Sequence, residues 1–171
     1  MNPLETGLDA NRLLLEQALA LLAALSPERY AVRRGDWAPV GAQYRHVLEH
    51  YQCFLAGVAT GAIDYDARRR DARLEQNPAR AAQATREALD ALASLRALGP
   101  DRPVAVQLRT AVDAPEPEWS RSTLAREIQF LVSHTVHHFA LIKLLLADEP
   151  VTLGPEFGVA PSTQAHARAE R

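Results

Sequence analysis

Apolar residues recur at three- and four-residue steps in four stretches of the chain, the spacing of one buried face of an α-helix. Each stretch ends at a helix-stopping signal, such as Pro27, Gly61 or Pro100. The pattern therefore predicts four long helices, at residues 4–25, 40–60, 78–98 and 124–146.

The connections between these helices are long. Residues 62–77 and 99–120 exceed a simple hairpin loop. Apolar and polar residues alternate in Val104–Val112, which indicates either a short strand or an extended connection. We expect an all-α fold, a four-helix bundle over residues 1–150 with long connections. A tail at 151–171 would pack on the bundle or extend from it.

Composition narrows the function. The 171 residues suit one domain, and the net charge of −2 makes general nucleic-acid binding unexpected, since this requires a concentrated basic surface. The single cysteine, Cys53, excludes an intrachain disulfide. The N-terminus does not resemble a signal peptide and no 18-residue apolar run occurs, so we expect a cytoplasmic protein without a membrane span.

Five of the six histidines fall within the second and fourth predicted helices. His46 and His50 lie four residues apart, as do His134 and His138, and this spacing places both imidazoles of a pair on one helical face. Imidazole is the commonest protein ligand for divalent transition metals. A lone histidine is usually a hydrogen-bonded core residue, but two such pairs on two helices favour a shared metal site.

Helical periodicity orients the histidines within each helix. His134 and His138 can both point inward, whereas His137 faces a flank. In the second helix the period favours His50 over His46 as the inward residue, and this choice stays open. Three imidazole ligands would leave coordination positions for a water or a thiol, as in catalytic metal sites.

Two segments, Asp36–His50 and Ser133–Ile142, resemble the DinB-like superfamily. The resemblance implies a four-helix bundle with up-down-down-up order. It also implies a divalent metal, zinc or nickel, held by three histidines. Trp37-Ala38-Pro39 matches the family motif that precedes the first ligand. In this alignment with the family, here called the family register, the ligands would be His46, His134 and His138.

The same register leaves His50, His137 and Glu49 as candidates for orienting a ligand or handling a proton in catalysis. One departure stands out, because Phe139–Ile142 follow the last ligand where many relatives carry a different sequence. The chemistry that faces the substrate can differ accordingly.

Characterised members of this superfamily include metal-dependent transferases that use low-molecular-weight thiols, and others are stress-inducible proteins. The resemblance therefore implies a metal-dependent transferase with a small-molecule substrate and a small thiol cosubstrate. A non-catalytic metal-binding stress-response bundle and a metal-dependent hydrolase remain alternatives. A di-iron carboxylate site is disfavoured, because no glutamate stands three residues before any clustered histidine. Wide apolar stripes also make a homodimer possible.

Other candidate residues have simpler explanations. Cys53 fits small core filling better than a place at the site. Arg45 and the run Arg68–Arg70 could bind an anionic substrate, but a solvated charged surface is the favoured interpretation. The Arg- and Asp-rich segment 64–77 is expected to be a solvated loop or a short helix. Asp64-Tyr65-Asp66 within it could help to ligate or position, but solvation in a loop explains these residues as well.

Overall fold

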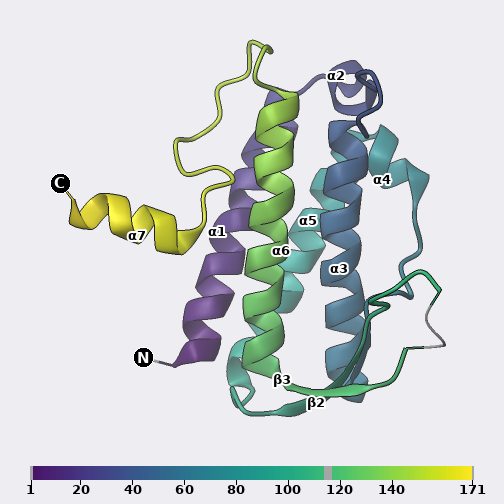
Figure 1. The fold of residues 1–171 in the computed structure, drawn as a ribbon, viewed down its shortest axis with the longest axis vertical. Helices are drawn as coiled ribbons and strands as arrows, with labels where there is room; N and C mark the ends of the chain where they lie inside the picture. Colours follow the sequence, from purple (N-terminus) through teal and green to yellow (C-terminus); the bar gives the residue numbers. More distant parts are fainter. Residues whose placement is uncertain (1, 114–116, 171) are drawn as a thin grey trace.

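Four long helices pack side by side in the computed structural model, which describes residues 2–113 and 117–170 (Figure 1). α1 and α3 each pack against both α5 and α6. The mostly helical prediction is confirmed, and none of the described helices is long and apolar enough to cross a membrane. The third helix ends earlier than predicted and continues as a 3-10 turn, η1 (Leu95–Ala97). The four long helices are α1 (Pro3–Ala24), α3 (Val40–Thr60), α5 (Pro78–Ser94) and α6 (Leu124–Leu145).

Local capping explains where these helices begin and end. The Asn2 side chain accepts a hydrogen bond from the Leu4 N–H at the start of α1. Thr123 caps α6, and the hydroxyl of Ser122 donates to the Glu127 carboxylate. α3 ends at Gly61, whose φ of 81° is a left-handed conformation that favours glycine.

The all-α expectation is incomplete, because the chain also forms a three-stranded sheet. Its order is β1 (Ala62–Asp64), β2 (Pro103–Gln107) and β3 (Ser120–Thr123), with β1 parallel to β2 and β2 antiparallel to β3. β1 follows α3, β2 follows η1, and β3 leads into α6. The sheet therefore joins the ends of α3 and α5 to the start of α6. Alternation in the sequence marked only β2, because β1 and β3 are too short to show a period.

Two short helices lie between the long ones in sequence, α2 (Pro27–Ala31) and α4 (Ala72–Gln76), and both contact α3. The Tyr30 hydroxyl in α2 donates to the Leu74 carbonyl of α4 at 2.7 Å. Gly41 of α3 allows α4 to approach closely, since a Cβ there would lie 1.9 Å from the Glu75 carbonyl oxygen. Segment 64–77 is thus partly helical and anchored rather than a fully solvated loop.

A buried polar network fixes α1, α3 and α6 relative to one another. The Tyr51 hydroxyl donates to Asn11 Oδ1 at 2.6 Å and lies 3.0 Å from Thr135 Oγ1. The Asn11 amide in turn donates to the Ile128 carbonyl at 3.0 Å. Because the network links α3 to α6, it sets the spacing of the two helices that carry the histidines.

The C-terminal segment packs against the core through Val151, Leu153, Phe157 and Ala160 before its last helix. The Phe157 ring stacks on Phe139 of α6 with centroids 4.5 Å apart. Gly158 follows at φ 69°, where a Cβ would lie 2.6 Å from the Ala140 nitrogen. The last helix, α7 (Pro161–Ala169), has no buried residue and projects away from the four long helices in Figure 1.

Candidate metal centre

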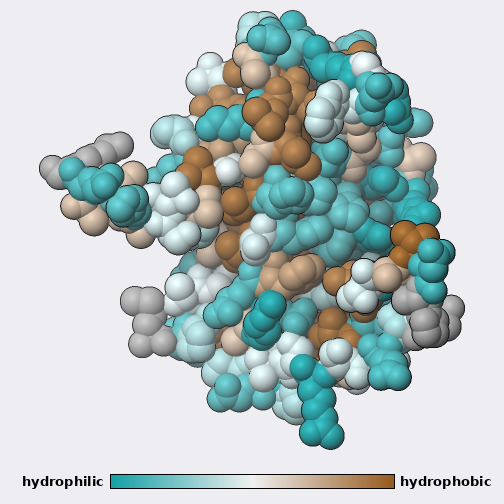
Figure 2. All heavy atoms as spheres, in the orientation of Figure 1, coloured by the Kyte–Doolittle hydropathy of each residue, from teal (hydrophilic) through white to brown (hydrophobic). Residues whose placement is uncertain are grey.

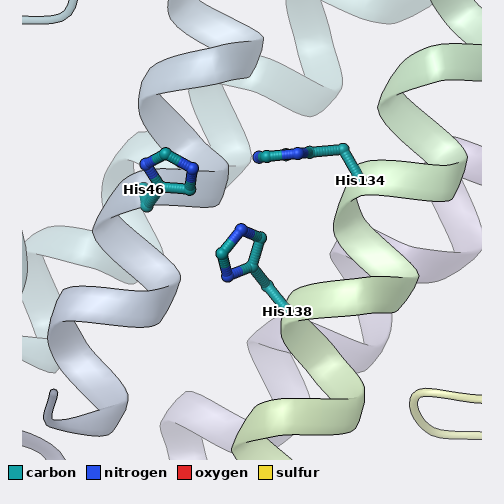
Figure 3. Close-up of side chains that lie close together, drawn as sticks. All are labelled: His46, His134 and His138. Carbon is teal, nitrogen blue, oxygen red and sulfur yellow. The ribbon is translucent and has the colours of Figure 1, made fainter. Parts of the chain in front are cut away.

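Three imidazole rings converge between α3 and α6 (Figure 3). His46 comes from α3, and His134 and His138 come from successive turns of α6. One ring nitrogen from each lies within 4.8 Å of the other two. The ring centroids are 5.0, 4.6 and 4.7 Å apart. The structure thus brings together the three residues that the family register selected as ligands.

The environment keeps these rings neutral. All three are partly buried, and burial is the main cause of pKa values lowered from 6.5 to about 3 for His46, about 2 for His134 and about 4 for His138. Repulsion between neighbouring imidazolium charges acts in the same direction. Neutral imidazole carries the lone pair that a metal ion needs, so the rings are in the ligating form at neutral pH.

Hydrogen bonding leaves ring nitrogens available for a cation. The His138 Nδ1–H donates to the Gln43 side-chain oxygen at 2.7 Å, which directs the lone pair to Nε2. His134 Nε2 is buried and has no hydrogen-bond partner among the described residues. A buried polar atom without a partner is costly unless something binds it. The donor set therefore fits a divalent transition metal.

His50 lies beside the three rings but serves them differently. Its side chain is 3% exposed, and its Nδ1–H donates to the His46 carbonyl at 2.9 Å. Its ring lies 3.9 Å from that of His134 and stacks on Tyr65 at 5.5 Å between centroids. The periodicity was thus right that His50 faces inward. Tyr65, expected in a solvated loop, is buried, and its hydroxyl donates to Glu127.

The other two predicted catalytic residues lie at the margin. His137 is exposed, and its ring centroid lies 5.1 Å from that of His138 in an edge-to-face arrangement. The Glu49 carboxylate is buried and accepts the Asp71 N–H at 2.8 Å. It also pairs with Arg45 at 3.9 Å. His137 thus adjoins the cluster on its solvent side, while Glu49 holds the segment that precedes α4.

Arg68 belongs to the site, contrary to the solvated surface favoured from the sequence. Its Nη1 donates to His46 Nδ1 at 2.7 Å and lies 3.4 Å from Nε2 of the same ring. The side chain is half-buried, and its Nε has no acceptor among the described residues. A basic run flanked by aspartates gave no sign of this contact. Gln43 was missed for the same reason, because neither residue follows the histidine spacing.

Solvent reaches this part of the molecule. Figure 2 shows hydrophilic residues gathered over the middle of α6 and α3, the helices from which the three rings project. The three rings are only partly buried. A cation and a small molecule can therefore approach the cluster without opening the core.

Comparison with known proteins agrees with this architecture. A sequence model described as the DinB superfamily matches residues 10–142, which span all four long helices and the three clustered histidines. No curated protein matches the chain. Since the match covers most of the 171 residues, the chain belongs to the DinB superfamily.

Proposed function

We propose that the protein is a metal-dependent transferase that uses a low-molecular-weight thiol. The observation that carries the proposal is the set of three neutral imidazoles within 4.8 Å, one of which has a buried nitrogen without a partner among the described residues. Three protein ligands are typical of catalytic sites, which keep a position open, whereas structural sites use four.

His46, His134 and His138 would hold the ion, with zinc or nickel as the proposed metal. A divalent cation there supplies Lewis acidity, which lowers the pKa of a thiol or water that binds it. Gln43 would keep the His138 ring in the ligating tautomer through the hydrogen bond at 2.7 Å. His50 would fix the α3 backbone at His46 through its bond to the His46 carbonyl.

His137 is the proposed proton carrier. It is the exposed member of the cluster, so it can exchange a proton with solvent while its ring touches His138. Glu49 has a positioning part instead, since its carboxylate already accepts the Asp71 N–H and pairs with Arg45.

We assign the four long helices the up-down-down-up order of the family. Support comes from the sheet, in which β1 after α3 runs parallel to β2 after α5, so both helices end at the same edge of the molecule. α6 starts from that edge through β3 and returns along α1.

The test is a turnover assay on protein purified without a metal-binding tag. A panel of low-molecular-weight thiols is offered with a chromogenic electrophile, before and after removal of metal by a chelator and after return of zinc or nickel. We expect thiol transfer that is lost on chelation and restored by metal. His134→Ala should abolish it, whereas His166→Ala, on the exposed helix α7, should not.

The outcomes separate the alternatives. Full thiol turnover by the metal-free protein would refute the proposal. Stoichiometric metal without thiol turnover, together with ester hydrolysis, would indicate a metal-dependent hydrolase. Stoichiometric metal without either activity would indicate a non-catalytic metal-binding protein.

A further inference from the structure

A cavity of about 530 Å³ is lined by residues of α3, β1 and α5 and by residues 67–69, and one of these, Arg68, contacts His46 of the histidine cluster. Its apolar wall includes Leu55, Ala56, Ala84 and Ala88. Arg68 and Arg69 also line the cavity. Such a cavity is large enough for a small organic molecule with an apolar part.

The acidic residues of this cavity already have partners. The Glu49 carboxylate accepts the Asp71 N–H, and the Asp64 carboxylate accepts the Asp66 and Ala67 N–H groups. The Glu87 carboxylate accepts from the Gln83 amide. These N–H donors therefore satisfy part of the hydrogen-bonding capacity of each carboxylate.

The guanidinium groups are in the opposite situation. Within residues 2–113 and 117–170, neither Arg68 nor Arg69 pairs with a carboxylate, and the buried Arg68 Nε–H has no acceptor. Guanidinium binds carboxylate and phosphate groups through paired hydrogen bonds. The cavity thus offers an apolar wall and an unpaired site for an oxyanion.

Arg68 also joins the cavity to the histidines. Its Nη1 lies 2.7 Å from Nδ1 and 3.4 Å from Nε2 of His46, so it is close to whichever of the two nitrogens would bind a cation. Two positive groups cannot share that position. Binding of a metal ion to His46 therefore requires the Arg68 guanidinium to withdraw, and an anion in the cavity gives it a partner.

We propose that this cavity binds a small apolar molecule bearing a carboxylate or phosphate group through Arg68, and that this binding frees His46 for the cation. Because such coupling is reciprocal, metal binding at the histidines strengthens binding of the anion by the same factor. The coupling rests on the proposed metal site, whereas the anion site does not.

The anion site is tested on the metal-free protein. Benzoate and phenyl phosphate are titrated by NMR, in the presence of chelator. We expect saturable binding that weakens at least about tenfold in Arg68→Ala, since hydrogen bonds to a charged group are worth that much. Ala56→Trp, which fills the cavity from an exposed position, should also abolish binding. Arg86→Ala, an exposed change on α5 outside the cavity, should leave it unchanged.

The coupling is tested by competition for zinc with a chromophoric chelator. Arg68→Ala should bind zinc about tenfold more tightly than the wild type, because it removes the competing group. Saturating benzoate should tighten zinc binding by the wild type but not by Arg68→Ala. Ala56→Trp should match the wild type without benzoate and gain nothing from it.

Two results would overturn the proposal. One is that neither probe binds saturably, or that binding is the same in Arg68→Ala. The other is that Arg68→Ala binds zinc no more tightly than the wild type. If the wild type binds no zinc at all, the proposed function fails, while the titration of the metal-free protein still decides the anion site.

Discussion

The Gln43→Leu substitution tests whether the orientation of the His138 imidazole affects metal binding when all three histidines are kept. The Gln43 oxygen accepts the His138 Nδ1–H at 2.7 Å, so Nε2 keeps the lone pair that faces the other two rings. Leucine has a similar size but no acceptor. In Gln43→Leu the ring can adopt the other tautomer and rotate, although all three histidines remain.

The expected effect on metal affinity is a loss of about 10- to 100-fold, the range found when a hydrogen bond that orients a histidine ligand is removed. This corresponds to roughly 1.4–2.8 kcal/mol at about 1.4 kcal/mol per factor of ten. The free energy of unfolding of the metal-free protein should fall by only about 1 kcal/mol, since one neutral hydrogen bond is lost. Metal binding should thus suffer more than stability.

Zinc affinity is measured by chelator competition, and stability by urea unfolding in the presence of a chelator. Gln43→Glu is the matched control, because its carboxylate accepts the same N–H and should retain zinc binding. Gln83→Leu, an exposed change on α5, controls for the loss of an amide elsewhere. Unchanged zinc affinity in Gln43→Leu would show that Gln43 does not set the tautomer of His138.

Three further predictions concern stability. Tyr51→Phe should lower the free energy of unfolding by about 1–3 kcal/mol, because it leaves the buried Asn11 oxygen without its donor; an unchanged urea midpoint would contradict this. Gly41→Ala should lower the thermal midpoint clearly, because its Cβ would lie 1.9 Å from the Glu75 carbonyl oxygen and α4 would have to shift. A thermal midpoint equal to that of the wild type would show that α4 can shift without a loss of stability. The clustered histidines have pKa values lowered from 6.5 to about 4 or less, so between pH 6.5 and 5 the unfolded chain binds more protons than the folded chain. The metal-free protein should therefore lose stability as pH falls from about 7 to 5. A urea midpoint that stays constant over this range would show that folding does not lower the pKa values of these histidines.

The long helices were predictable because their signal is local and repeated. α3 has the bounds that its apolar spacing predicts, and α6 differs by one residue at its end. The short elements were not predictable in the same way. β1 and β3 have three and four residues, and each is a strand only because β2, from a distant part of the chain, pairs with it. Local sequence carries no information about such a partner.

The choice between His46 and His50 also separates what local sequence predicts from what distant contacts decide. Periodicity identifies the more buried residue, and His50 is indeed 3% exposed. Burial and ligation are separate properties, however. The ring nitrogens that lie within 4.8 Å of one another belong to His46, His134 and His138, and His50 is not in this group. The family register selected His46 because it carries information from a whole fold.

The amino-acid sequence alone determined the long helices, the two i, i+4 histidine pairs and the chemistry of imidazole. Each of these depends on residues within a few positions of one another. Packing alone decided which imidazoles meet, that Gln43 sets a tautomer, and that Arg68 reaches His46 from 22 positions away. Those contacts depend on the relative rotation of α3 and α6 and on the path of segment 65–71. Both are set by the sum of many distant contacts, which no short stretch of sequence contains.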